Sequence, residues 1–167
     1  MRLFFIFLIS FFFLTSFAFS QQKESNEFKC FDKNVVTAFD FLKTTRSFGN
    51  YEVEEEWSRF LSSDKIEKKL VELDGGRQYT FLVVAEPGVD ATALEIRDLS
   101  GVQVEYVYKI NEMDNNEINF FYTPLNDGIY QILYRVVNSA KIYTCTYMAV
   151  LKGDPDPDLS DEEEEEE

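Results

Sequence analysis

The chain has 167 residues, of which 16 are basic and 31 acidic, and it contains no histidine; its formal net charge is −15. The absence of histidine excludes Ser-His-Asp and Cys-His nucleophile activation and histidine-ligated metals. No basic cluster is larger than Lys68-Lys69, which argues against binding to nucleic acid. Composition therefore predicts a protein that is not an enzyme and that has no catalytic residues.

Residues Met1–Ser20 have the pattern of a signal peptide. Arg2 precedes an almost wholly apolar segment, and Ala18-Phe19-Ser20 supplies small residues at the positions next to a cleavage site. Cleavage after Ser20 predicts an extracytoplasmic protein, periplasmic or secreted. The alternative is an uncleaved anchor, because the apolar segment is close to the lower limit of about 17 residues that span a bilayer.

Cys30 and Cys145 are the only two cysteines of the chain. An even pair in an exported protein predicts a disulfide, because extracytoplasmic compartments are oxidising. The alternative is a pair of unlinked, buried cysteines, since Cys145 shares an apolar strand face with Tyr143 and Tyr147.

Residues 21–63 are expected to form a helical prefix that packs on the rest of the domain. Apolar residues recur at helical spacing from Phe28 to Leu42, and Gly49-Asn50 punctuates the end of this first helix. A second amphipathic helix is expected from Tyr51 onward, with Trp57 on its packing face as a core anchor.

From residue 64 to 153 the apolar period changes to two, which predicts β-strands. Seven strands are expected at Ile66–Leu73, Arg77–Glu86, Ala93–Leu99, Val102–Lys109, Glu117–Thr123, Ile129–Val137 and Lys141–Leu151. Gly, Asn and Asp occupy the breaks between them, as turns require. The expected fold class is mainly β: a seven-stranded antiparallel β-sandwich, jelly-roll-like, with Ile129–Val137 as a central strand and Val102–Lys109 half-buried through its apolar side.

The order of turns and strands resembles the bacterial prepeptidase C-terminal type of secreted β-sandwich. The resemblance covers roughly residues 66–152 and rests on Leu73-Asp74-Gly75-Gly76 before Tyr79, Leu94-Glu95-Ile96-Arg97-Asp98 closed by Gly101, Phe120-Phe121 before Pro124, and Gly128-Ile129-Tyr130. It implies a free-standing accessory or binding domain. No binding residue of that family can be carried over to this sequence.

The tail 154–167 is expected to be disordered and to serve either solubility or docking to a basic partner. The charged residues of this tail are Asp154, Asp156, Asp158, Asp161, Glu162, Glu163, Glu164, Glu165, Glu166 and Glu167. A calcium site is a further possibility, if the loop with Glu112, Asp114 and Asn116 lies beside Asp127 at one end of the sandwich. An ordinary polar loop is the alternative for those residues. No other cofactor is expected.

These observations predict an exported, non-enzymatic binding or accessory protein of the bacterial cell envelope, with a protein or other envelope component as its partner. A polysaccharide-binding module is the first alternative, because a row of exposed aromatic rings on a sheet can bind sugars. The tyrosines considered for that role are Tyr79, Tyr106, Tyr108, Tyr122, Tyr130, Tyr134, Tyr143 and Tyr147, for which core packing is the default. A hydrolase with carboxylates from the loops around 86–90 and 112–117 is the second alternative.

Overall fold

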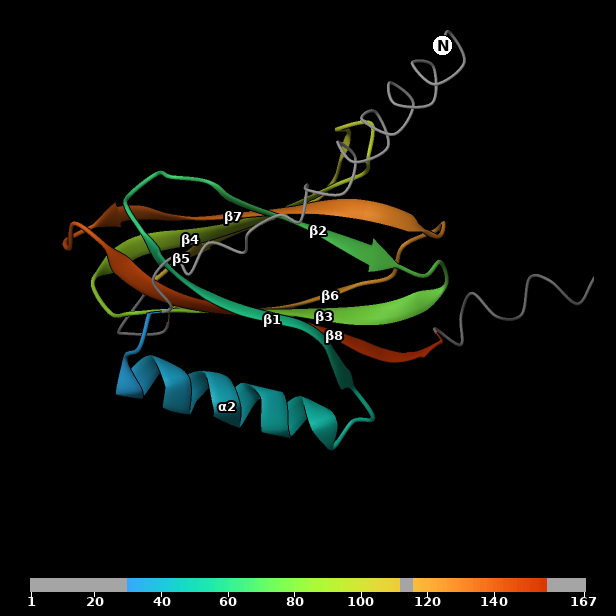
Figure 1. Ribbon diagram of the computed structural model, residues 1–167, viewed down its shortest axis with the longest axis horizontal. Coiled ribbons are helices and arrows are strands. Elements are labelled where there is room, and N and C mark those ends of the chain that lie inside the picture. The colour runs from blue at the N-terminus through green and yellow to red at the C-terminus, as the bar shows by residue number, and fades with distance from the viewer. Residues whose placement is uncertain (1–29, 112–115, 156–167) are drawn as a thin grey trace, which may run out of the picture.

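The structure is a computed structural model that describes residues 30–111 and 116–155. These residues form one helix and eight strands arranged in layers (Figure 1). The elements are α2 (Lys33–Ser47), β1 (Glu52–Leu61), β2 (Glu67–Leu73), β3 (Arg77–Ala85), β4 (Val89–Arg97), β5 (Gln103–Ile110), β6 (Glu117–Tyr122), β7 (Gly128–Ser139) and β8 (Thr144–Pro155). The predicted signal peptide 1–20 and residues 156–167 of the predicted tail lie outside the described residues, whereas residues 154 and 155 belong to β8.

The strands form two four-stranded sheets with the orders β1-β8-β3-β6, called sheet A, and β2-β7-β4-β5, called sheet B. Every pair of neighbouring strands is antiparallel. The pairs β1–β8, β2–β7, β3–β6 and β4–β5 are those of one long hairpin whose tip is the turn between β4 and β5. Rolling that hairpin up adds the pairs β3–β8 and β4–β7, which is the strand order of a jelly roll. The prediction of a mainly β, antiparallel sandwich is confirmed, with eight strands instead of seven.

The main core lies between the two sheets. It contains inward-facing residues of both sheets, among them Trp57 of β1, Phe81 of β3, Leu94 of β4 and Ile132 of β7. Tyr134 is 2% exposed and its burial raises the pKa of its hydroxyl to about 12. The expected central position of the 129–137 strand is confirmed, because β7 lies between β2 and β4.

Helix α2 packs against the outer face of sheet A, over its central strands β3 and β8 (Figure 1). Asp32 caps its N-terminus by accepting hydrogen bonds from the amides of Asn34 (2.9 Å) and Val35 (3.0 Å). The amide of Val35 is the main reason why the pKa of the Asp32 carboxyl is lowered. Val35 and Phe39 pack on a second, smaller core formed by Leu82, Val84, Ala149 and Leu151 of β3 and β8.

The second predicted helix is wrong, because residues 52–61 form strand β1 and pair with β8. Trp57 is a core anchor as expected, at 8% exposure, but it reaches the core from a strand. Two features conceal the strand pattern. The register with β8 shifts between Val53 and Glu55, and Arg59, which shares its side of the strand with Trp57 and Leu61, is charged and contacts Glu67 at 3.4 Å.

Strand β5 is also turned differently from the prediction. Its apolar residues Val104, Tyr106, Tyr108 and Ile110 are exposed on the outer side of sheet B, at 38–65%. Glu105, Val107 and Lys109 are on the inner side and are less exposed, with Val107 against the main core. The alternation predicted the strand but not which of its sides faces the core.

Candidate functional site

Cys30 and Cys145 form the predicted disulfide, with a Cα–Cα distance of 5.4 Å. Each cysteine is 1% exposed. The Tyr147 hydroxyl donates to the Cys30 carbonyl oxygen (2.8 Å), so β8 also holds the backbone of this residue. The bond therefore fastens the segment that leads into α2 to β8.

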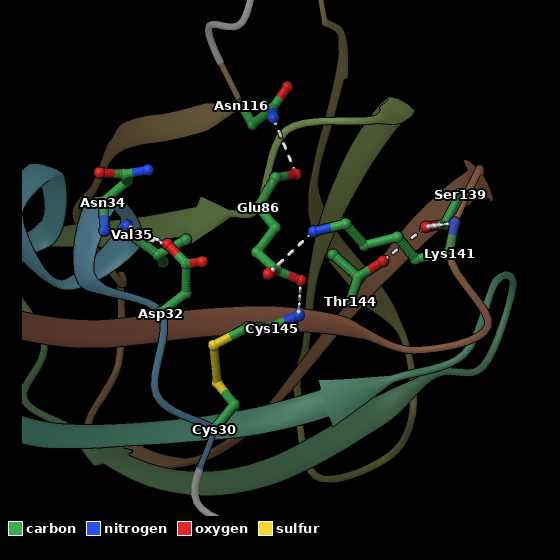
Figure 2. A network of polar contacts seen from close by, with 10 residues as sticks. All are labelled: Cys30, Asp32, Asn34, Val35, Glu86, Asn116, Ser139, Lys141, Thr144 and Cys145. Carbon is green, nitrogen blue, oxygen red and sulfur yellow. Dashed lines mark hydrogen bonds and ion pairs between the residues drawn. A yellow bond between two sulfur atoms is a disulfide. The ribbon is translucent and has the colours of Figure 1, made fainter.

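Glu86 is the centre of a network of polar contacts beside this disulfide (Figure 2). Its carboxylate accepts from the Cys145 amide (2.8 Å) and from the Lys141 ammonium (3.0 Å), and its own amide donates to the Cys145 carbonyl (2.9 Å). The Asn116 side-chain amide donates to the Glu86 carbonyl at 2.9 Å. Glu86, an acid of the hydrolase alternative, is thus engaged in fixing Cys145.

The structure does not bring the described members of the expected calcium set together. Asn116 precedes β6 and Asp127 follows it, so these two residues lie at opposite ends of a six-residue strand. The Asp127 carboxylate accepts from the Gly75 amide at 2.6 Å and ties two turns together. Glu112 and Asp114 lie outside the described residues. No group of three or more His, Cys, Asp or Glu side chains in the described ranges could hold a metal ion.

The outer face of sheet B is the strongest candidate for a functional surface. Its residues form rows across the strands: Tyr106 of β5, Glu95 of β4, Leu133 of β7 and Lys68 of β2 are successive partners in register. Other large apolar side chains that are 44–65% exposed on this face or next to it are Ile66, Leu70, Tyr108, Ile110 and Ile129. No described helix covers this face, in contrast to the outer face of sheet A.

A hollow of about 130 Å³ lies on this face. Its lining is formed by Ile66, Ala93, Glu95, Tyr106, Leu133, Tyr134 and Arg135. Ala93 pairs with Tyr108 on one side and Arg135 on the other, so a small side chain lies between two large ones. The Glu95 carboxylate is bound by Arg97 at 2.7 Å, which raises the pKa of the Arg97 guanidinium. The hollow therefore combines an aromatic ring, aliphatic groups and charges of both signs.

The tyrosines considered for sugar binding separate into two groups. Tyr79, Tyr130 and Tyr134 are at most 7% exposed and belong to the main core, with Tyr122 packed against them. Tyr106 and Tyr108, at 44% and 48% exposure, lie together on the outer face of sheet B. Tyr143 is 61% exposed in the turn between β7 and β8, and Tyr147 packs near α2.

Sequence reasoning did not identify Glu95, Arg97 or Arg135 as members of a surface site. The outer side of β4 has small side chains at one end, Ala91 and Ala93, and charged side chains at the other, Glu95 and Arg97. That signal becomes meaningful only when the neighbouring strands are known, because Arg135 and Tyr106 come from β7 and β5.

No family model matches the chain, and no curated protein matches it. Among solved structures, a chain described as "CBM4 structure and function" is similar with a TM-score of 0.44 and 14% sequence identity. The match covers 62% of this chain and 79% of that chain. Within the described residues, no helix is long and apolar enough to cross a membrane.

Proposed function

We propose that the protein is an exported, non-enzymatic binding protein of the bacterial cell envelope that engages a protein partner through the outer face of sheet B. The observation that carries this proposal is the difference between the two outer faces. Helix α2 packs on β3 and β8, the two central strands of sheet A, whereas no described helix packs on the outer face of sheet B, which exposes large apolar side chains from three of its strands. Contiguous apolar surface of this kind marks interaction sites in proteins.

The composition of the face favours a protein over other ligands. Aliphatic residues such as Ile66, Leu70 and Ile129 accompany the two tyrosines, and Lys68 and Arg97 supply charge among them. An apolar centre with aromatic residues and Arg, bordered by charges, is typical of protein interfaces. The signal segment and the Cys30–Cys145 disulfide support a location outside the cytoplasm.

Substitution on β2 and β7 tests the proposal. Leu70→Asp with Ile129→Asp places two charges on the face, and binding of envelope proteins to the immobilised chain is then measured by pull-down and mass spectrometry. The matched control is Leu125→Asp with Ile142→Asp, at positions that are 79% and 82% exposed in connecting turns. Partners that are lost only with the first pair support the proposal. Equal recovery of all partners with both double variants would contradict it.

A polysaccharide-binding module is the second candidate, and the hollow on the same face favours it. The Tyr106 ring can stack on a sugar, while Glu95 and Arg135 can hydrogen-bond to hydroxyl groups. Tyr106→Ala is then expected to abolish a glycan-array signal that Tyr143→Ala retains. A blank array for the unmodified chain would dispose of this candidate without affecting the protein-binding proposal.

A further inference from the structure

Strand β5 is an edge strand whose outer edge has no partner among the described residues. The Asn111 amide, next to the end of β5, donates to the Asp90 carbonyl at 2.9 Å, so the odd-numbered residues turn their backbone groups toward β4. The Tyr106 amide instead donates to the carboxylate of its own neighbour Glu105 at 3.2 Å. The backbone groups of residues 106, 108 and 110 therefore lie along the open edge.

Of the usual protections of an open edge, the segment from Glu105 to Ile110 of β5 has only inward charges. Natural edge strands are protected by Pro, by bulges or by charges that point inward. From Glu105 to Ile110 there is no Pro and no register shift with β4. These inward charges, Glu105 and Lys109, have opposite signs and lie two residues before and two residues after Val107. An antiparallel second copy can therefore place each of them opposite a charge of the other sign.

We propose that two copies of this chain pair antiparallel through β5, about a two-fold axis at Val107. In this register Tyr106 lies opposite the second copy's Tyr108, and Val104 lies opposite Ile110. Each Glu105 lies opposite a Lys109. Tyr106 and Tyr108 both have their backbone amide and carbonyl groups at the open edge. Tyr106 and the second copy's Tyr108 can therefore form a hydrogen-bonded pair of an antiparallel ladder.

Cross-strand pairs of aromatic residues, of β-branched residues and of opposite charges each stabilise a sheet. A shift of two residues in either direction would place Glu105 and Lys109 opposite residues that are uncharged, so the charges select this register. The dimer joins two copies of sheet B into one eight-stranded sheet and makes their outer faces continuous. It stands apart from the proposed function, because it needs no other partner.

Charge exchange provides the decisive test, with dimerisation measured by sedimentation equilibrium on the chain that starts at Gln21, which contains all the described residues. Glu105→Lys or Lys109→Glu alone is expected to weaken the dimer about tenfold, because each creates two like-charge contacts. The double variant restores opposite charges, and so does a 1:1 mixture of the two single variants. Lys68→Glu and Glu72→Lys on β2 are matched controls that leave dimerisation unchanged.

Restoration by the mixture separates pairing from a fold defect, because Lys109 also contacts the Glu117 carbonyl oxygen. The register is tested by Val107→Cys, since residues on the axis are close enough for a disulfide between copies. Rapid dimer cross-linking of this variant under mild oxidation, at a rate at least about tenfold above that of Tyr143→Cys, is expected. A monomeric unmodified chain, a mixture that stays monomeric, or equal cross-linking rates would each overturn the proposal.

Discussion

The Cys30–Cys145 disulfide should make a large contribution to the stability of this protein. The bond joins residues 115 apart in the sequence. For a loop of this length, the chain-entropy model gives a loss of about 4.8 kcal/mol in the free energy of unfolding when the cross-link is removed. Cys30→Ala with Cys145→Ala is the appropriate perturbation, because both side chains are buried and alanine introduces no polar group there.

The assay is urea unfolding followed by the fluorescence of Trp57, which is the only tryptophan and is buried. The double variant is expected to lose about 4–5 kcal/mol, and its m-value is expected to rise because the unlinked unfolded chain exposes more surface. When the disulfide of the unmodified protein is reduced in urea, the urea midpoint of unfolding of the reduced protein should equal that of the variant. A loss below about 1 kcal/mol with an unchanged m-value would refute the loop-closure reasoning.

Three further predictions concern the elements that support the disulfide and the sandwich. Phe39→Ala should cost about 3–5 kcal/mol of unfolding free energy, measured in urea, whereas the same change at Phe41, which is 69% exposed on the same helix, should cost less than about 1 kcal/mol. Asp32→Ala should cost about 1 kcal/mol through loss of the helix cap, and Asp32→Asn should retain most of it. Because the pKa of Asp32 is lowered in the folded protein, its ionised form adds stability above about pH 3.8. The stability advantage of the unmodified protein over Asp32→Asn should therefore vanish as the pH falls through the folded pKa. An advantage that persists at lower pH would contradict this. Asp127→Ala removes the acceptor for the Gly75 amide and should lower the melting temperature by a few degrees, whereas Asp127→Asn, which retains an acceptor oxygen, should lower it less.

The strands from residue 66 onward could be predicted because turn residues and period-two alternation agree there. The strand at 52–61 could not, since the pattern of Val53, Trp57, Phe60 and Leu61 fits a helix as well as a bulged strand. What makes this segment a strand is its ladder with β8, whose residues are about 90 positions later in the sequence. Long-range pairing of this kind overrides local preference and leaves no local signal.

The disulfide could be predicted from the number of cysteines and the predicted signal peptide, but its surroundings could not. Glu86, Asn116 and Lys141 meet around Cys145 only because three connections end at the same side of the sandwich. The candidate face was hidden for a related reason. Its hollow takes residues from β4, β5 and β7 and from the segment before β2, and no two of those strands are consecutive except β4 and β5.

A comparison of β3 with the strands of sheet B supports the proposal that the exposed face binds a partner. Strand β3 is apolar on both sides because Phe81 faces the core between the sheets, while Leu82 faces α2. Strands β5 and β7 also have large apolar residues on their outer side, including Tyr108 and Leu133, yet no described helix covers them. In β3, the covering layer accounts for the second apolar side. Under the proposed function, the corresponding layer on sheet B is the binding partner. The proposal therefore predicts that the Leu70→Asp and Ile129→Asp pair will reduce binding while leaving the melting temperature nearly unchanged.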